Sequence, residues 1–333
     1  MRLDVPLAKR RAAGAIVSTD PLITIGKHED GLPMGLASLF PERFESKPSL
    51  HFMGLDWTAE PPDEVALIAE ELADARRRLP LARFVFNVNT HYEAALFSRA
   101  GIPNIVANGM SFVDERTFVP PPPVPFAERR YDAVYTARLD PFKRHELAAK
   151  IPTLMLVYGT PEEGELEHVK SILPHAYYAN HDVEPGRYQH IHHSKMSALL
   201  NQCSVGLCLS AEEGAMRSAM EYLLCGLPVV STESVGGRDR YFIGPHTRVV
   251  PPDPDAVASA VADLKARAFH PIAVREYVSR LVAFDRHNFL TSANKIVERE
   301  LGVRDRFRSF APFAGAAVRW RLVSEIEEEF DRR

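Results

Sequence analysis

Short apolar runs alternate with helical patterns along most of this 333-residue chain. Runs with the length and composition of strands occur at residues 13–18, 49–55, 83–89, 104–107, 131–136, 153–158, 205–209, 227–231 and 248–250. Helical patterns lie between them at residues 62–79, 215–225 and 255–268. The later runs are compact and largely apolar, which is typical of strands buried on both faces. This alternation predicts an α/β protein built on parallel sheets.

A run of prolines divides the pattern into two halves. Residues 120–123 are all proline and are followed by Val124 and Pro125. Such a run forms a stiff, extended connector, because each ring fixes φ and removes an N–H donor. We therefore place the domains at residues 1–123 and 124–305. Two consecutive doubly wound, Rossmann-like domains that face each other across a cleft are the simplest interpretation.

The composition excludes several classes of protein. Lys and Arg number 40 and Asp and Glu 44, and the resulting net charge of −4 has the wrong sign for a protein held on nucleic acid by phosphate contacts. Cys203, Cys208 and Cys225 lie in one apolar segment and indicate reduced core thiols. No uncharged apolar run approaches the ~18 residues of a membrane span, and the first residues lack the pattern of a secretory signal. We expect a cytoplasmic protein, either free or peripheral to the inner face of the membrane.

The segment of residues 210–230 combines acidic residues with a strand-to-helix turn, the position at which open parallel sheets bind ligands. On a helix, the spacing of Glu213 and Glu221 places them roughly on one side and about 12 Å apart. One carboxylate would hold sugar hydroxyls and the other ribose hydroxyls, while N–H groups of Gly214, Ala215 and Met216 would receive phosphate oxygens. Taken alone, such a pair is more typical of a glutamate at a helix start and a solvated helix residue.

A second segment follows the first predicted strand of the second domain. Arg138 and Lys143 lie on a strand-to-helix loop, where two cations are well placed to neutralise a diphosphate leaving group. Taken alone, the two side chains would be ordinary surface charges.

Together these segments resemble the retaining glycosyltransferases of family 4, the glycosyl transferases group 1 domain of the GT-B fold, over roughly residues 130 to 300. The family's Gly-Arg-Leu loop and downstream Lys correspond to residues 137–139, with Ala in place of Gly, and to Lys143. Its element of two glutamates separated by seven residues falls on Glu213 and Glu221. Its Gly-Leu-Pro-Val-Val strand is present at residues 226–230.

The resemblance implies a retaining, metal-independent glycosyltransferase of the hexosyltransferase type that needs no cofactor. Its donor would be a nucleoside diphosphate sugar, with UDP or GDP as the nucleotide, and its acceptor a hydroxyl of a glycan, a lipid-linked molecule or a small molecule. Arg138 and Lys143 would stabilise the departing diphosphate. Glu213 would orient the donor sugar, and Glu221 would bind the ribose.

Three further donor-binding residues are assigned by position rather than by motif. Gly159 follows a predicted strand, and Asn180 and His181 lie in a later loop of the same domain. We expect them to enclose the nucleotide base.

The first domain departs from the family pattern, because it is short and lacks a recognisable Gly-Gly loop. The nearest candidate for that loop contains Gly26 and His28. His28, His51 and His91 are alternatives for the first-domain histidine that touches the donor sugar in the family, although a structural role is the commoner one for a histidine. The resemblance also implies a C-terminal helix, residues 306–333, that crosses back onto this domain. Its basic and aromatic residues would alternatively suit an anionic lipid surface.

Two other features bear on the function. His181, His190, His192 and His193 form a local cluster, but their spacing fits no familiar ligand signature, and we predict no metal site. Arg238 occupies a loop where the family commonly has an acidic residue, which predicts a basic donor pocket. Two alternative functions stay open: a GT-B epimerase that acts on the sugar nucleotide, and a non-catalytic partner subunit that binds a nucleotide sugar.

Overall fold

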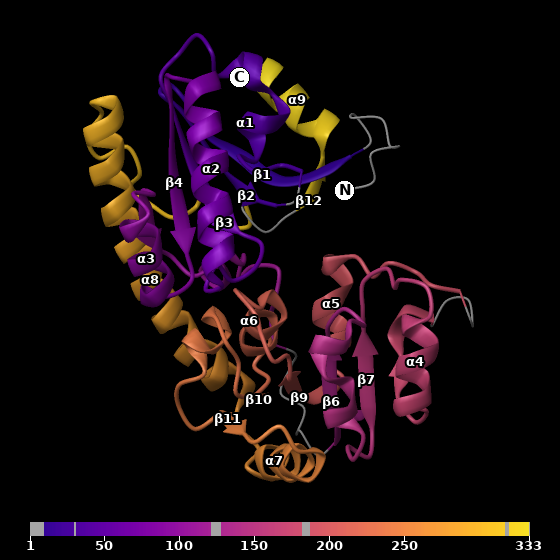
Figure 1. Ribbon diagram of the computed structural model, residues 1–333. Helices are drawn as coiled ribbons and strands as arrows, with labels where there is room; N and C mark the ends of the chain where they lie inside the picture. Colours follow the sequence, from indigo (N-terminus) through magenta and orange to yellow (C-terminus); the bar gives the residue numbers. More distant parts are fainter. Residues whose placement is uncertain (1–9, 30, 121–127, 182–186, 317–319, 333) are drawn as a thin grey trace. The chain divides into compact units, whose positions relative to one another are not determined.

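The computed structural model describes residues 10–29, 31–120, 128–181, 187–316 and 320–332 (Figure 1). The chain divides into two compact units, Met1–Val113 with Val282–Arg333, and Asp114–Leu281. The first limit precedes the predicted boundary because the segment after Val113 is hydrogen-bonded within the second unit. Arg275 Nη2 donates to the Glu115 carbonyl at 2.7 Å, and Ser197 Oγ donates to the Val119 carbonyl at 3.0 Å. Residues 121–125, most of the proline run, lie outside the described residues.

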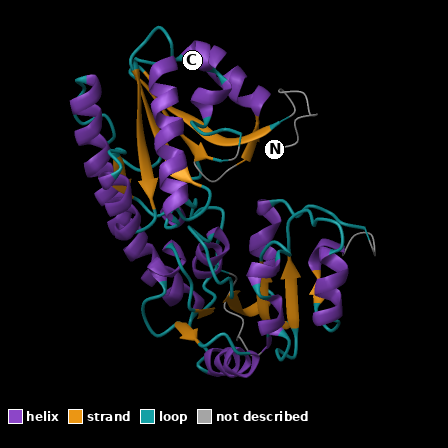
Figure 2. Cartoon of the chain, in the orientation of Figure 1, coloured by secondary structure: helices purple, strands orange, loops and turns teal. Residues whose placement is uncertain are grey.

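The first unit contains a six-stranded sheet in the order β12-β1-β2-β3-β4-β5. Its strands are β1 (Arg11–Thr19), β2 (Leu22–His28), β3 (Ser49–Leu55), β4 (Ala82–Val88), β5 (Asn104–Val106) and β12 (Trp320–Leu322). The four strands from β2 to β5 are parallel and follow sequence order, whereas β1 is antiparallel to both of its neighbours. From β2 to β5, strands and helices alternate along the chain (Figure 2).

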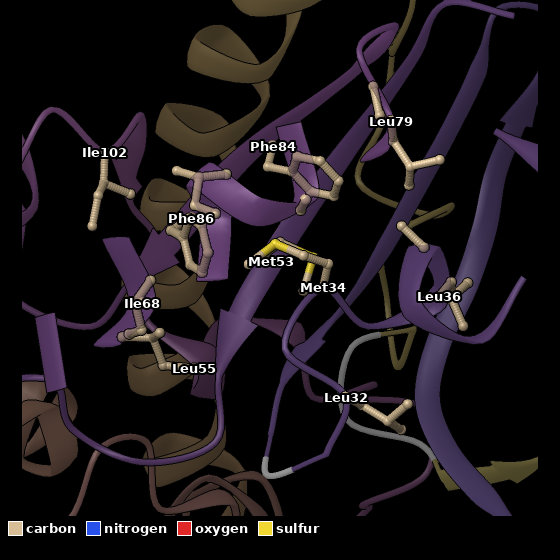
Figure 3. Packing of buried hydrophobic residues seen from close by; sticks show 14 of the residues in the cluster. Leu32, Met34, Leu36, Met53, Leu55, Ile68, Leu79, Phe84, Phe86 and Ile102 are labelled. Atoms are coloured by element: carbon tan, nitrogen blue, oxygen red, sulfur yellow. The ribbon is translucent and has the colours of Figure 1, made fainter. Parts of the chain in front are cut away.

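Two hydrophobic clusters cover the two faces of this sheet. One face packs against α1 (Leu36–Leu39), α2 (Pro62–Arg78), α3 (His91–Arg99) and α9 (Val323–Arg332). Figure 3 shows part of this cluster, in which Phe84 and Phe86 of β4 and Met53 of β3 lie with Ile68 of α2. The helix α2 forms where the sequence predicts it, because its apolar stripe meets this face and three arginines lie near its negative C-terminal end.

The other face is covered by residues from the C-terminal part of the chain. Phe289, Ala293 and Val297 of α8 (Pro271–Leu301) join Phe310 and Phe313 in a cluster on Ile25 and Phe52. This packing explains why residues 282–305 belong to the first unit and not, as predicted, to the second. Three aromatic side chains of the C-terminal segment, Phe307, Phe310 and Phe313, are therefore core residues, whereas Trp320 is exposed.

The C-terminal segment does not form the single helix expected over residues 306–333. Residues 307–316 form turns, β12 then pairs antiparallel with β1, and α9 follows. Residues 317–319 and 333 lie outside the described part of the chain. The segment belongs to the first unit because β12 and α9 complete its sheet and its core.

The second unit contains a six-stranded, wholly parallel sheet in the order β11-β10-β9-β6-β7-β8. Its strands are β6 (Tyr131–Thr136), β7 (Leu154–Val157), β8 (Tyr177–Tyr178), β9 (Cys203–Cys208), β10 (Val229–Thr232) and β11 (Thr247–Val250). Its helices are α4 (Glu165–Ile172), α5 (His193–Leu200), α6 (Arg217–Leu224), α7 (Pro254–Ala266) and the first part of α8. Counted within the unit, this is the doubly wound order 3-2-1-4-5-6, read from the other edge, with its reversal between β6 and β9.

Candidate active site

The candidate site is built at the carboxyl ends of β6 and β9. These two strands are neighbours in the sheet although many residues separate them in sequence, and the chain winds outward in opposite directions from them. Loops that follow such a pair diverge and leave room for a ligand. The two segments singled out by the sequence are these two loops.

A buried ion pair joins the two loops. Lys143 ends a short 3-10 turn after β6, and its ammonium group binds Oε2 of Glu213, in the loop after β9. Lys143 is 5% exposed and Glu213 is 9% exposed. The loops are also joined through their backbones, because Ala211 N donates to the Phe142 carbonyl at 3.1 Å. Two predicted catalytic residues, one from each loop, are thus in direct contact.

Arg238 is joined to this pair through Ser210. The sequence predicted that Arg238 makes the pocket basic, but its charge is not exposed. Its side chain is fully buried. Nη1 donates to the Ser210 carbonyl at 2.6 Å and reaches Ser210 Oγ at 3.4 Å, while Nη2 donates to the Thr232 carbonyl and Nε to Asp239 Oδ1 at 2.9 Å. Ser210 Oγ in turn donates to Glu213 Oε2 at 2.9 Å. The guanidinium donates its hydrogen bonds to groups of the protein.

Arg138 lies at the surface of the same loop. Its side chain is 65% exposed, and its Nε forms an ion pair with Asp140 Oδ2 at 2.9 Å. The ring of Phe142 links it to the buried cation, because Arg138 Cζ is 5.5 Å and Lys143 Nζ 4.8 Å from the ring centroid. The two predicted phosphate-binding cations therefore flank one aromatic ring, one exposed and one buried.

The helix after the acidic loop begins later than the sequence suggested. α6 starts at Arg217, with Met216 as its N-cap, so Glu213 precedes the helix. The predicted helical geometry for Glu213 and Glu221 is therefore wrong. The N–H groups of Gly214, Ala215 and Met216 donate no hydrogen bond within the described part of the chain. They are available to an anion, as expected for the residues before a helix.

Glu221 lies in the second turn of α6 and is partly buried. Burial raises the pKa of its carboxyl group, and the nearby charge of Arg217 opposes that effect. Its carboxylate has no hydrogen-bond partner among the described residues. The carboxylate can therefore accept a hydrogen bond from a polar ligand.

The three base-binding candidates differ in their surroundings: Asn180 is held by backbone groups, His181 contacts Tyr158, and Gly159 has open space beside it. Asn180 is buried, and both ends of its amide bind backbone: Oδ1 accepts from Tyr158 N at 3.0 Å, and Nδ2 donates to the carbonyls of Tyr158 and Gln189 at 3.0 Å. His181 Nε2 lies 2.9 Å from the Tyr158 hydroxyl, and burial lowers the pKa of its imidazole. A methyl group added to Gly159 would meet no atom within 4 Å.

The first-unit candidates are distributed over different environments. His51 is a core residue: its ring is fully buried against Phe44 and Phe84, its nitrogens lie 2.8 Å from Thr24 Oγ1 and 3.1 Å from Ser49 Oγ, and burial lowers its pKa to about 3. This excludes His51 as a ligand-contacting residue in this structure.

The predicted loop around Gly26 is also wrong, because Gly26 lies inside strand β2 and pairs with Gly14 and Met53. His28 ends β2, and its Nε2 binds Glu71 Oε2 at 2.6 Å. His91 begins α3 and is exposed.

Sequence reasoning missed a polar cluster at the carboxyl edge of the first sheet. Lys27, at the end of β2, forms an ion pair with Asp56, which follows β3. Burial and the nearby charge of Asp56 raise the pKa of Glu29 to about 7. Asn87 of β4 lies in the same row of the sheet, and its amide is buried without a hydrogen-bond partner among the described residues. The available signal was the position of these residues at the ends of parallel strands.

The described part of the chain contains no candidate metal site and no candidate membrane span. There, no group of three or more His, Cys, Asp and Glu residues is arranged to hold a metal ion. No helix among those residues is long and apolar enough to cross a membrane.

One family model matches part of the second unit. Residues 142–267, less than half of the chain, match the family model described as "Glycosyl transferases group 1". The matched segment contains both Lys143 and Glu213. The chain is an enzyme that transfers sugars. A comparison with curated proteins found no match.

Solved structures show the fold. A sucrose-phosphate synthase from Thermosynechococcus elongatus is 19% identical, with a TM-score of 0.52 over 77% of this chain and 68% of that one. A structure described as trehalose-6-phosphate from E. coli bound with UDP-2-fluoro glucose is 14% identical, with a TM-score of 0.53 over 84% of this chain and 73% of that one. The predicted GT-B class, with two parallel-sheet α/β units, is confirmed.

Proposed function

We propose that the protein transfers a hexose-type sugar from a nucleoside diphosphate sugar to a hydroxyl acceptor, with retention of the anomeric configuration and without a metal ion. The observation that carries this proposal is the meeting of Lys143 and Glu213 at the strand-order reversal. After Glu213 in sequence lie backbone N–H groups that donate to none of the described residues. A cation and N–H donors suit a diphosphate, and a carboxylate suits sugar hydroxyls.

In the proposed mechanism, Arg138 and Lys143 stabilise the charge that develops on the departing diphosphate. Preorganised cations act most strongly where charge appears in the transition state. The N–H groups of Gly214, Ala215 and Met216 bind phosphate oxygens in front of α6. These groups supply positive charge that a divalent ion would otherwise provide.

Each of the two carboxylates binds a different sugar of the donor: Glu213 binds the transferred sugar, and Glu221 binds the ribose. Oε2 of Glu213 accepts from Lys143 and Ser210, whereas Oε1 forms no hydrogen bond with a described residue and is left to accept from a donor-sugar hydroxyl. Glu221 accepts from the ribose hydroxyls. The base lies at Gly159 and His181, where Asn180 fixes the backbone of Tyr158.

UDP is the first nucleotide to test. The solved structure from E. coli that shares the fold is described as bound with UDP-2-fluoro glucose. We propose a location in the cytoplasm, where the three buried free thiols stay reduced. Peripheral attachment to the inner face of the membrane is the second part of this location hypothesis, and binding to anionic vesicles tests it.

Calorimetric titration with UDP and GDP, each with and without EDTA, tests the proposal. We expect heat of binding from at least one nucleotide, unchanged by the chelator. Absence of heat from both would contradict a nucleoside diphosphate donor, and binding that disappears with EDTA would contradict metal independence. A thermal-shift screen of nucleotide sugars then selects the donor, because a ligand that binds only the folded state raises the melting temperature.

Product analysis tests the reaction itself. Donor incubated alone would be converted to a second nucleotide sugar by an epimerase, whereas a transferase needs an acceptor to form a glycoside. NMR of the anomeric proton in the product distinguishes retention from inversion.

A further inference from the structure

We propose that Arg238 is a positioning residue, which acts through Ser210 to fix the Glu213 carboxylate so that Oε1 faces the donor sugar. The inference rests on the proposed function and extends it to a side chain that touches no substrate. Its basis is the hydrogen-bond chain from Arg238 through Ser210 to Glu213.

The direction of each hydrogen bond in this chain is fixed by chemistry. A guanidinium has donors and no acceptor. The Ser210 hydroxyl oxygen therefore accepts from Arg238 Nη1, at 3.4 Å, and its hydrogen is directed to Glu213 Oε2, at 2.9 Å. The stronger contact of Nη1, to the Ser210 carbonyl at 2.6 Å, holds the backbone of the same residue.

These contacts determine which oxygen of Glu213 remains for a substrate. Oε2 accepts from both Ser210 and Lys143, so rotation of the carboxylate would break two hydrogen bonds at once. Oε1 forms no hydrogen bond or ion pair with a described residue. Without Ser210, only the flexible lysine would hold the carboxylate, and its two oxygens would exchange roles more easily.

Burial of the guanidinium supports a specific role. An arginine that is 0% exposed is costly to place in a protein interior. It is held by the ends of two strands, through Thr232 at the end of β10 and Ser210 after β9. The same two strand ends are held a second time by Arg144, whose Nε donates to the Leu209 carbonyl at 2.6 Å and whose Nη2 donates to Thr232 Oγ1 at 2.7 Å.

Arg144 therefore provides a matched control. It ties the end of β9 to β10 as Arg238 does, but none of its hydrogen bonds to the described residues is to Ser210 or Glu213. A purely structural role of Arg238 predicts that Arg238→Lys and Arg144→Lys behave alike. A positioning role predicts that only Arg238→Lys changes recognition of the sugar.

The experiment measures the affinities of UDP and UDP-glucose for the full chain by calorimetry. Ser210→Ala and Arg238→Lys should each weaken UDP-glucose binding about 10-fold, which corresponds to about 1.4 kcal/mol, because each removes a hydrogen bond from the chain that holds the charged carboxylate. UDP has no sugar for Glu213 to bind, and its affinity should change less than about 2-fold. Arg144→Lys should leave the ratio of the two affinities unchanged.

A double-mutant cycle completes the test. If Arg238 acts through Glu213, Arg238→Lys and Ser210→Ala should cause no further loss of UDP-glucose affinity when Glu213 is already Ala, which has no side-chain oxygen to position. Additive losses, equal losses for both ligands, or the same affinity ratio in Arg144→Lys would overturn the inference. Ser210→Ala keeps the test decisive if Arg238→Lys fails to fold. Failure of the unaltered protein to bind UDP or GDP would instead remove the proposed function itself.

Discussion

The ammonium group of Lys143 is paired with Oε2 of Glu213 across two loops of the second unit. The cation assigned to the diphosphate is therefore balanced by a carboxylate before any donor binds. A buried pair of this kind is costly to break on one side, because the remaining charge loses its partner. The pair links stability to donor recognition.

Removing one member of this pair should cost more stability than removing both. Lys143→Met leaves the Glu213 carboxylate buried beside Ser210 without its cation and should destabilise the protein by about 3–5 kcal/mol. The double variant Lys143→Met with Glu213→Gln should recover most of that loss. Urea unfolding of the two single variants and the double variant measures these differences. Losses that simply add would show that the pair is not energetically coupled.

Arg138→Ala should separate ligand binding from stability. The side chain is 65% exposed, so the free energy of unfolding should change by less than about 0.5 kcal/mol. The affinity for UDP should fall about 10-fold, because a charged hydrogen bond to the diphosphate is lost. Arg116→Ala is the matched control, since Arg116 is also exposed and also pairs with an aspartate two residues away, Asp114. Equal UDP affinity in both variants would remove Arg138 from the donor site.

His51 should make the first unit sensitive to acid. The pKa of its imidazole is about 3 in the folded protein, because the ring is buried, and 6.5 in the unfolded chain. Between these two pH values the unfolded chain carries a proton on His51 that the folded chain does not. The free energy of unfolding therefore falls as the pH drops below 6.5, by about 1.4 kcal/mol per pH unit. Glu29, with a pKa raised to about 7 from 4.5, acts in the opposite direction over pH 7 to 4.5.

The comparison of wild type with His51→Gln isolates the histidine. Because Glu29 is present in both proteins, its effect cancels in the difference between their unfolding free energies. That difference should change steadily in favour of the variant from pH 6.5 to pH 5.5. A difference that is independent of pH would mean that His51 titrates normally in the folded state.

Gly206→Ala should disrupt the second unit, whereas Gly159→Ala should not. A Cβ on Gly206 would lie 2.2 Å from Tyr222 Cδ2, and the hydroxyl of Tyr222 accepts from Thr136 N at 2.6 Å, at the start of the Arg138 loop. We expect a loss of about 1–3 kcal/mol or more from such overpacking. Gly159→Ala adds a methyl group in open space, so its melting temperature should be unchanged while UDP binding weakens. Unchanged UDP binding would place the base elsewhere.

The sequence by itself determined the local structure and the chemistry of the two loops. The runs at residues 49–55 and 131–136 are β3 and β6, and the helix predicted over residues 62–79 is α2. The fold class followed from their alternation. These features depend on periodicity and side-chain type within a few residues, which a single sequence displays.

The tertiary structure decided which residues meet. β2, read from the sequence as part of a glycine loop, is a strand because β1 and β3 pair with both of its edges. The partnership of Lys143 and Glu213 exists because β6 and β9 are neighbours, and the burial of Arg238 and His51 depends on elements that pack from distant parts of the chain. Strand order and packing are set by the free energy of the whole fold, so the spacing of residues along the chain does not disclose them.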